Sequence, residues 1–198
     1  MVIPDALLAA ILSIFLFLTL CAALALIVVC LRRPAGVPLI VAGCLIVLSL
    51  LVVVVAPVNV PLILGLVITL LGVTLAVFGG NPVTRQVLTV ATHGRVADGD
   101  NGGILLKAAG LEGQAAIDAP VREVLRGGTT IGYLERLAVA LAIVAGFPEA
   151  IAVVVAIKGI GRFSELAAAE ARERFIIGTL ASLLWACVVA GLVRLAIW

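Results

Sequence analysis

One carboxylate and two cations lie close to apolar segments of membrane length, and they are the side chains best suited to chemistry: Glu135, Lys158 and Arg162. Ionisable groups held together inside a membrane could bind an ion, carry a proton or contact a lipid headgroup. The same three residues could instead form a structural ion pair that locks two helices together at the membrane surface. We favour the structural interpretation and keep the functional one as an alternative.

No other part of the chain has the spacing of a catalytic or cofactor motif. GxSxG, HExxH, Walker and GxGxxG patterns are absent, and the calcium-like run at 98–103 lacks its closing glutamate. His93 is the only histidine, and no CxxC occurs among the four cysteines, which all fall in apolar runs: Cys21, Cys30, Cys44 and Cys187. We therefore expect no catalytic residue, no metal site and no cofactor, and a protein that is not an enzyme.

Composition identifies the solvent of this chain as lipid. Of its 198 residues, 64% are hydrophobic and only 12% are charged, whereas a soluble domain carries about 25% charged residues. The mean hydropathy is +1.36. The net charge of +2, with no continuous basic patch, also argues against a nucleic-acid partner.

Four apolar segments are long enough to cross a bilayer: 6–31, 37–56, 61–78 and 175–193. We expect the third to end at Gly79-Gly80 and a short surface helix to begin at Asn81-Pro82. Gly65 and Gly72 are seven residues apart on one face of the third segment, where a neighbouring helix could approach closely.

The polar segment 81–130 is expected to be a cytoplasmic loop with short elements rather than an independent domain. Residues 104–109 could form a short strand or a helical turn, and 118–125 a short helix. A charged surface helix over 164–174 should precede the last span.

The segment 134–157 could be one helix or two. Gly146-Phe147-Pro148-Glu149 would put a helix breaker and a carboxylate at the centre of a single span, where a charge costs at least about 3 kcal/mol. A hairpin, with arms Ile131–Gly146 and Pro148–Arg162, puts twelve of the thirteen lysines and arginines on one side of the membrane, as the positive-inside rule prefers. Its arms, about 24 Å long, either cross a thinned bilayer or re-enter without crossing.

Antiparallel arms place Glu135 at a depth between Lys158 and Arg162, within reach of either cation. Arg136 should face elsewhere and extend its side chain to the lipid headgroups.

Small residues recur at intervals of four, a pattern typical of close helix packing in lipid: Ala138/Ala142/Gly146, Ala152/Ala156 and Gly178/Ser182/Ala186/Ala190. They predict that the hairpin and the last span form one compact unit, with Gly146, Gly178, Ser182 and Ala186 in helix contacts. The alternative is that alanine is simply common here. Hydroxyls such as those of Thr179 and Ser182 are expected to bond back to their own helix.

Three phrases carry a family resemblance: RGGTTIGYLER (126–136), KGIGRFSEL (158–166) and ERFIIGT (173–179). They resemble phrases of uncharacterised bacterial integral membrane proteins, over roughly the last seventy residues of the chain. The resemblance implies a bacterial plasma-membrane location and no assigned activity.

The sequence thus predicts an all-α membrane protein, a polytopic helical bundle with four full spans plus a short helical hairpin at about 131–162. Residues 1–80 form three transmembrane helices, 81–130 a cytoplasmic loop, and 131–198 the hairpin and the last span, with both termini outside. Its partners are the lipid bilayer and a membrane protein or a second copy of the chain. We expect a non-enzymatic accessory or scaffold component of a membrane complex, with a small oligomeric transporter or channel that uses Glu135, Lys158 and Arg162 as the alternative.

Overall fold

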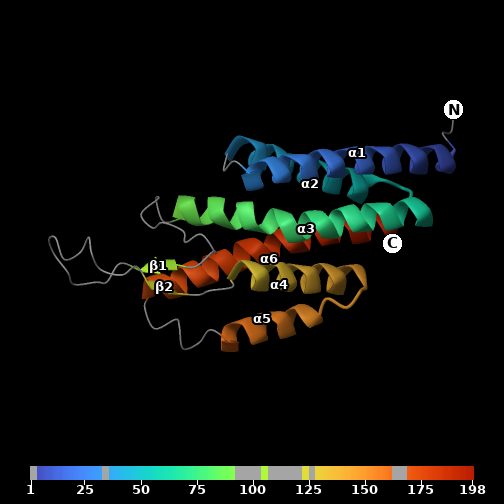
Figure 1. Ribbon diagram of the computed structural model, residues 1–198. Coiled ribbons are helices and arrows are strands. Elements are labelled where there is room, and N and C mark those ends of the chain that lie inside the picture. Colours follow the sequence, from blue (N-terminus) through green and yellow to red (C-terminus); the bar gives the residue numbers. More distant parts are fainter. Residues whose placement is uncertain (1–3, 33–35, 92–103, 107–121, 125–127, 162–168) are drawn as a thin grey trace.

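The computed structural model describes residues 4–32, 36–91, 104–106, 122–124, 128–161 and 169–198. Within these ranges the chain forms six helices and one two-stranded antiparallel ladder: α1 (Asp5–Arg32), α2 (Gly36–Val55), α3 (Leu62–Ala91), β1 (Ile104–Leu106), β2 (Arg122–Val124), α4 (Gly128–Val144), α5 (Ala150–Gly161) and α6 (Ala169–Ile197). The helices lie side by side along a common direction (Figure 1). The expected helical bundle of a multi-pass membrane protein is confirmed.

Helix length separates the spans from the hairpin. Four helices are long and apolar enough to cross a membrane: α1, α2, α3 and residues 172–197 of α6. The 30 residues of α3 correspond to about 45 Å, more than the roughly 30 Å hydrocarbon core. The 12 residues of α5 correspond to about 18 Å, so α5 alone is too short to cross an undisturbed bilayer.

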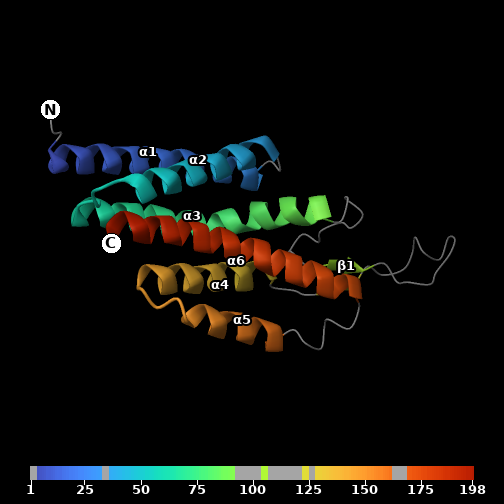
Figure 2. The ribbon, with the colours of Figure 1, turned by 180° about the vertical axis from the view of Figure 1, so that it is seen from behind.

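The helices are stacked in an order that leaves α5 at one edge. α1 and α2 pair with each other, and α1 lies on α3 while α2, besides α1, contacts mainly α6. α3 packs most extensively on α6, and α4 covers both α3 and α6 (Figures 1 and 2). α5 packs mainly on α4, and none of its residues is buried. The opposite side of α5 is therefore open to lipid or to another chain.

Burial follows the helical repeat. The core of α1 consists of residues three or four apart, which share one helix face: Leu12, Leu16, Leu20, Ala23 and Ile27. Other apolar residues of the same helix, such as Ile14 and Leu18, are 59% exposed. Because α1 is apolar on every face, its exposed side is suited to hydrocarbon rather than water.

Glycines allow α3 and α6 to approach each other closely. A Cβ atom at Gly65 would contact Ile197, one at Gly72 would overlap Val193, and one at Gly79 would overlap the indole of Trp185. These glycines are spaced by seven residues and lie on one face of α3. The close approach predicted at Gly65 and Gly72 is confirmed, and it supplies the van der Waals contact that joins helices in lipid.

The expected end of the third span at Gly79-Gly80 is wrong, because α3 runs unbroken through both glycines and Pro82 to Ala91. Pro82 has no N–H to offer the carbonyl four residues earlier, which normally kinks or breaks a helix. Here the adjacent turn is covered by side chains from α4 and α6. Tertiary contacts therefore stabilise a helix that the local sequence disfavours.

Two further boundaries differ from expectation. Residues 122–124, placed in a short helix, instead form strand β2, whose Val124 is aligned with Ile104 of β1, while the rest of 118–125 lies outside the described residues. The strand alternative within 104–109 is confirmed for Ile104–Leu106. Residues 169–174 of the expected surface helix belong to the same helix as the last span, α6, while 164–168 lie outside the described residues.

The predicted hairpin is confirmed, and its bend has a defined backbone geometry. Gly146 has a φ of 79°, a conformation that residues with a Cβ rarely adopt. Its N–H donates to the Ile143 carbonyl, and the N–H of Phe147 donates to the Ala142 carbonyl. This pair of bonds is the Schellman motif that ends a helix at glycine, and it turns the chain from α4 towards α5.

Candidate functional site

Glu135 and Lys158 are brought together by the hairpin. The Lys158 ammonium donates to Glu135 Oε2, and the two side chains are 15% and 8% exposed respectively. The Lys158 Nζ also lies 5.8 Å from the centre of the Phe175 ring, a cation–π distance. This single side chain thus tethers α5 to both α4 and α6. The third predicted member, Arg162, lies outside the described residues.

Arg136, next to Glu135, forms the centre of a second polar cluster that the sequence did not indicate. It is 2% exposed, and the expectation that it reaches the headgroups is corrected. Its Nε donates to the Val77 carbonyl, its Nη1 to Ser182 Oγ and its Nη2 to Asn81 Oδ1, each at 2.7 Å. One guanidinium therefore joins α3, α4 and α6, and all three of these acceptors are neutral.

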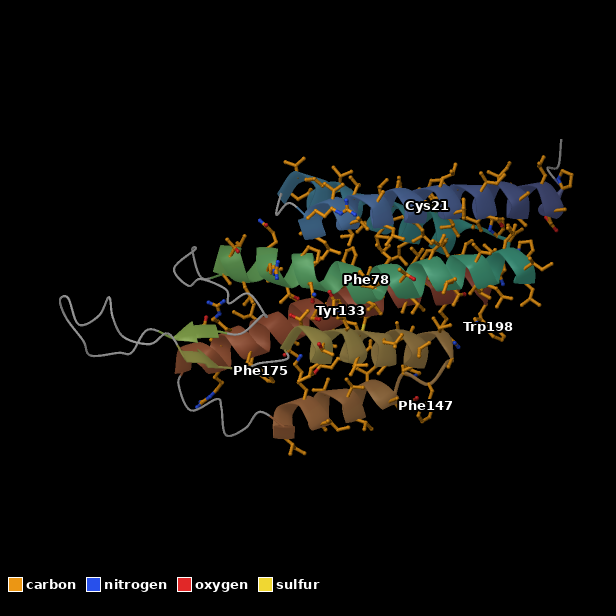
Figure 3. All side chains as sticks on the ribbon, in the orientation of Figure 1. Cys21, Phe78, Tyr133, Phe147, Phe175 and Trp198 are labelled. Atoms are coloured by element: carbon orange, nitrogen blue, oxygen red, sulfur yellow. The ribbon has the colours of Figure 1, made fainter. Side chains whose placement is uncertain are left out.

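Two glycines make room for this guanidinium. A Cβ atom at Gly80 of α3 would overlap Arg136 Cδ, Nε and Cζ, and one at Gly132 of α4 would lie 3.2 Å from its Nη1. The ring of Tyr133 lies 5.2 Å from the Arg136 Cζ atom. Figure 3 shows Tyr133 beside Phe78, and these two rings lie 5.5 Å apart between α4 and α3.

Side chains from α4 and α6 donate to backbone carbonyls of α3 in the turns that precede Pro82. Proline at position 82 leaves the Phe78 carbonyl without its usual helical donor. Arg136 donates to the neighbouring Val77 carbonyl. Trp185 of α6 also donates, through Nε1, to the Leu75 carbonyl at 3.1 Å. Side chains from two helices thus supply donors to the part of α3 that precedes the proline.

The predicted packing residues of α6 lie in this junction. Ser182 is 5% exposed and Ala186 fully buried, and a Cβ atom at Gly178 would lie 3.4 Å from Thr84 Cγ2 of α3. Ser182 accepts from Arg136. Thr179 Oγ1, expected to bond back to its own helix, has no hydrogen-bond partner in the part of the chain that the structure describes.

The other two stripes of small residues are placed differently. Gly146 is exposed at the bend rather than in a contact between helix interiors, and Ala138, Ala152 and Ala156 are also exposed. α4 turns a different face inward, with Gly132, Arg136 and Val139 among its buried residues. The compact unit predicted for the hairpin and the last span therefore includes α4, whereas α5 stays outside it.

Arg194 supports the bend from α6. Its Nη1 donates to the Ile143 carbonyl at 3.3 Å and to the Val144 carbonyl at 3.2 Å. These are among the last carbonyls of α4, where the negative end of the helix dipole lies, and the Ile143 carbonyl also accepts from the Gly146 N–H. A cation there stabilises the helix end and fixes the position of the bend beside α6.

The chemistry available at these clusters is hydrogen bonding and charge pairing. Among the described residues, no three His, Cys, Asp or Glu side chains gather as ligands for a metal ion. A groove of about 610 Å³ between α1 and α2 is lined by apolar side chains, among them Leu12, Phe15 and Val52. It has no polar side chain to orient a ligand, and it belongs to different helices from the charged clusters.

Comparison with known proteins gives no relative for this architecture: no family model, no curated protein and no solved structure matches the chain.

Proposed function

We propose that the protein is a non-enzymatic accessory or scaffold component of a bacterial plasma-membrane complex. In this proposal both termini lie outside and residues 81–130 lie in the cytoplasm. The excess of lysine and arginine on one side of the hairpin topology supports that orientation. The resemblance of the phrases at 126–136, 158–166 and 173–179 to those of bacterial membrane proteins supports the location.

The observation that carries the proposal is the joint projection of α3 and α6. Both extend past the other helices at the same end of the bundle (Figures 1 and 2). The projecting end of α3 bears Val87 and Val90, which are 38% and 68% exposed. Two helix ends that project beyond the shorter spans, with exposed apolar side chains on α3, are suited to contact with another protein.

The small-residue faces of the long helices are unavailable for this contact. Gly65, Gly72 and Gly79 face α6, and Ser182 and Ala186 are buried against neighbouring helices. We therefore propose the projection, rather than these buried faces, as the partner surface.

The geometry of the charged pair favours the scaffold over a transporter. A transport site needs charges that line a path open to water. Glu135 and Lys158 instead bond to each other, with side chains 8% and 15% exposed. This arrangement supports a structural role in holding α5 on α4.

Site-specific photo-crosslinking tests the proposal. A photoreactive amino acid at Val90 in native membranes should yield adducts with a defined protein. The matched control is Ile63, at the opposite end of the same helix and 79% exposed, which should yield lipid adducts alone. Absence of a protein adduct at Val90, together with copurification of the chain alone from native membranes, would contradict the proposal.

A further inference from the structure

The bend between α4 and α5 exposes backbone that is neither helical nor sheet-like. Residues 145–149 are all exposed, and the Phe147 side chain is 62% exposed. Glu149 adds a carboxylate to the same five residues. The N–H groups of residues 145–147 and the carbonyls of residues 147–149 are bonded to the end of α4 or to the first turn of α5. The bend therefore presents its carboxylate, and the peptide groups that the turn leaves unbonded, to whatever surrounds it.

The bend stops short of the end of the bundle. Figures 1 and 2 show the connection between α4 and α5 ending before the start of α1 and before the start of α3, which lie at the same end of the bundle. The contact with Arg194 agrees with this placement. Helical side chains point back towards the N-terminus of their own helix, and Arg194 reaches from the last turns of α6 to the Ile143 and Val144 carbonyls.

Irregular backbone exposed to hydrocarbon is not found in membrane proteins, because its N–H and C=O groups would have no partners there. A carboxylate such as that of Glu149 is also strongly disfavoured in hydrocarbon. Water, headgroups or another chain must therefore cover the bend, although the neighbouring helices continue beyond it.

We propose that the bilayer is locally thinned beside α5, so that phospholipid headgroups on the side of the chain's termini contact the bend. The length of α5 fits this arrangement. Its apolar part before Lys158 runs from Ala150 to Ile157, about 12 Å along the helix, against roughly 30 Å of hydrocarbon elsewhere. A short apolar surface is accommodated by thinning of the adjacent bilayer. The open face of α5 is thus in contact with lipid molecules whose headgroups lie closer to the bilayer centre than the headgroups around the other helices.

Collision measurements on spin labels test this inference. In a background with the four cysteines replaced by alanine, one label is placed at Phe147→Cys and a matched label at Leu70→Cys, which is 69% exposed on α3. Position 70 lies between Gly65 and Gly72, which contact Ile197 and Val193, so it has about the same depth as Arg194. Both proteins are reconstituted in vesicles of phosphatidylcholine and phosphatidylglycerol.

Thinning predicts that a water-soluble nickel complex collides with the label at position 147 several-fold more often than with the label at position 70. Oxygen, which concentrates in hydrocarbon, should show the opposite preference. Equal, oxygen-dominated collision rates at the two positions would overturn the proposal, because the bend would then lie in undisturbed hydrocarbon. Low collision rates with both reagents at position 147 would also overturn it, because another chain would then cover the bend.

Discussion

The two sides of the bundle are held together by different forces. α1 and α2 pack through apolar side chains such as Leu16, Leu20 and Ile46, with one side-chain hydrogen bond between them, from Ser49 to Thr19 at 3.0 Å, in the described part of the chain. The junction of α3, α4 and α6 instead contains a buried guanidinium with three acceptors. The first pair consists of helices that lipid can solvate singly. The junction consists of helices whose buried polar groups are hydrogen-bonded to one another.

The largest effect should follow from breaking the ion pair on the polar side. Lys158→Met leaves the Glu135 carboxylate without its cation among buried neighbours, and removal of one member of a buried pair costs about 3 kcal/mol or more. We expect a loss of this size in the free energy of unfolding, measured in mixed micelles by detergent titration.

A double-mutant cycle supplies the control for this prediction. Glu135→Gln combined with Lys158→Met should lose less stability than the sum of the two single variants, because the pair is then removed as a unit. Unchanged stability in Lys158→Met would mean that the pair does not hold α5 on α4.

A smaller loss is expected from filling the space that Gly80 leaves for Arg136. In Gly80→Ala the added methyl group would overlap the arginine side chain, which must then move away from its acceptors. Overpacking of this kind costs about 1–3 kcal/mol, and the better helix propensity of alanine offsets at most about 1 kcal/mol. The free energy of unfolding should fall accordingly.

Gly43 provides the matched substitution on the apolar side. A Cβ atom there meets nothing within 4 Å, so Gly43→Ala should leave stability unchanged or raise it by up to about 1 kcal/mol. If Gly43→Ala and Gly80→Ala had the same effect, the contrast between the two sides would not hold.

The smallest effect should come from the hydrogen bond between α1 and α2. Hydrogen bonds between membrane helices contribute about 0.6 kcal/mol on average, so Ser49→Ala should lower the free energy of unfolding by about that amount. A loss as large as that of Lys158→Met would show that the apolar side also depends on polar contacts.

Features set by residues close together in sequence were predictable. The four spans follow from apolar length, and the hairpin follows from a breaker and a carboxylate in the middle of a short apolar segment. The meeting of Glu135 with Lys158 follows from counting residues on either side of the bend. These inferences need only helix geometry, the cost of a charge in lipid and, for the hairpin, the excess of lysine and arginine on one side of the membrane.

The Arg136 junction could not be read in this way, because its acceptors lie 46 to 59 residues away in sequence on two other helices. The run Gly79-Gly80-Asn81-Pro82 looks like a helix end when read alone. In the bundle Trp185 packs against Gly79 and Arg136 packs against Gly80. Asn81 accepts a hydrogen bond from the same arginine. Gly79 continues the seven-residue series of Gly65 and Gly72, and this spacing was the one local signal that α3 extends further.

The position of Arg136 in the chain has a consequence for biosynthesis. α4 carries Glu135 and Arg136 side by side, yet Lys158 and Ser182 lie in α5 and α6, which leave the ribosome later. When α4 first reaches the translocon, only its α3 acceptors, Val77 and Asn81, have already been made. α4 therefore acquires its full set of polar partners only after α5 and α6 have been made and inserted, so completion of the junction is a late step in the insertion of these helices.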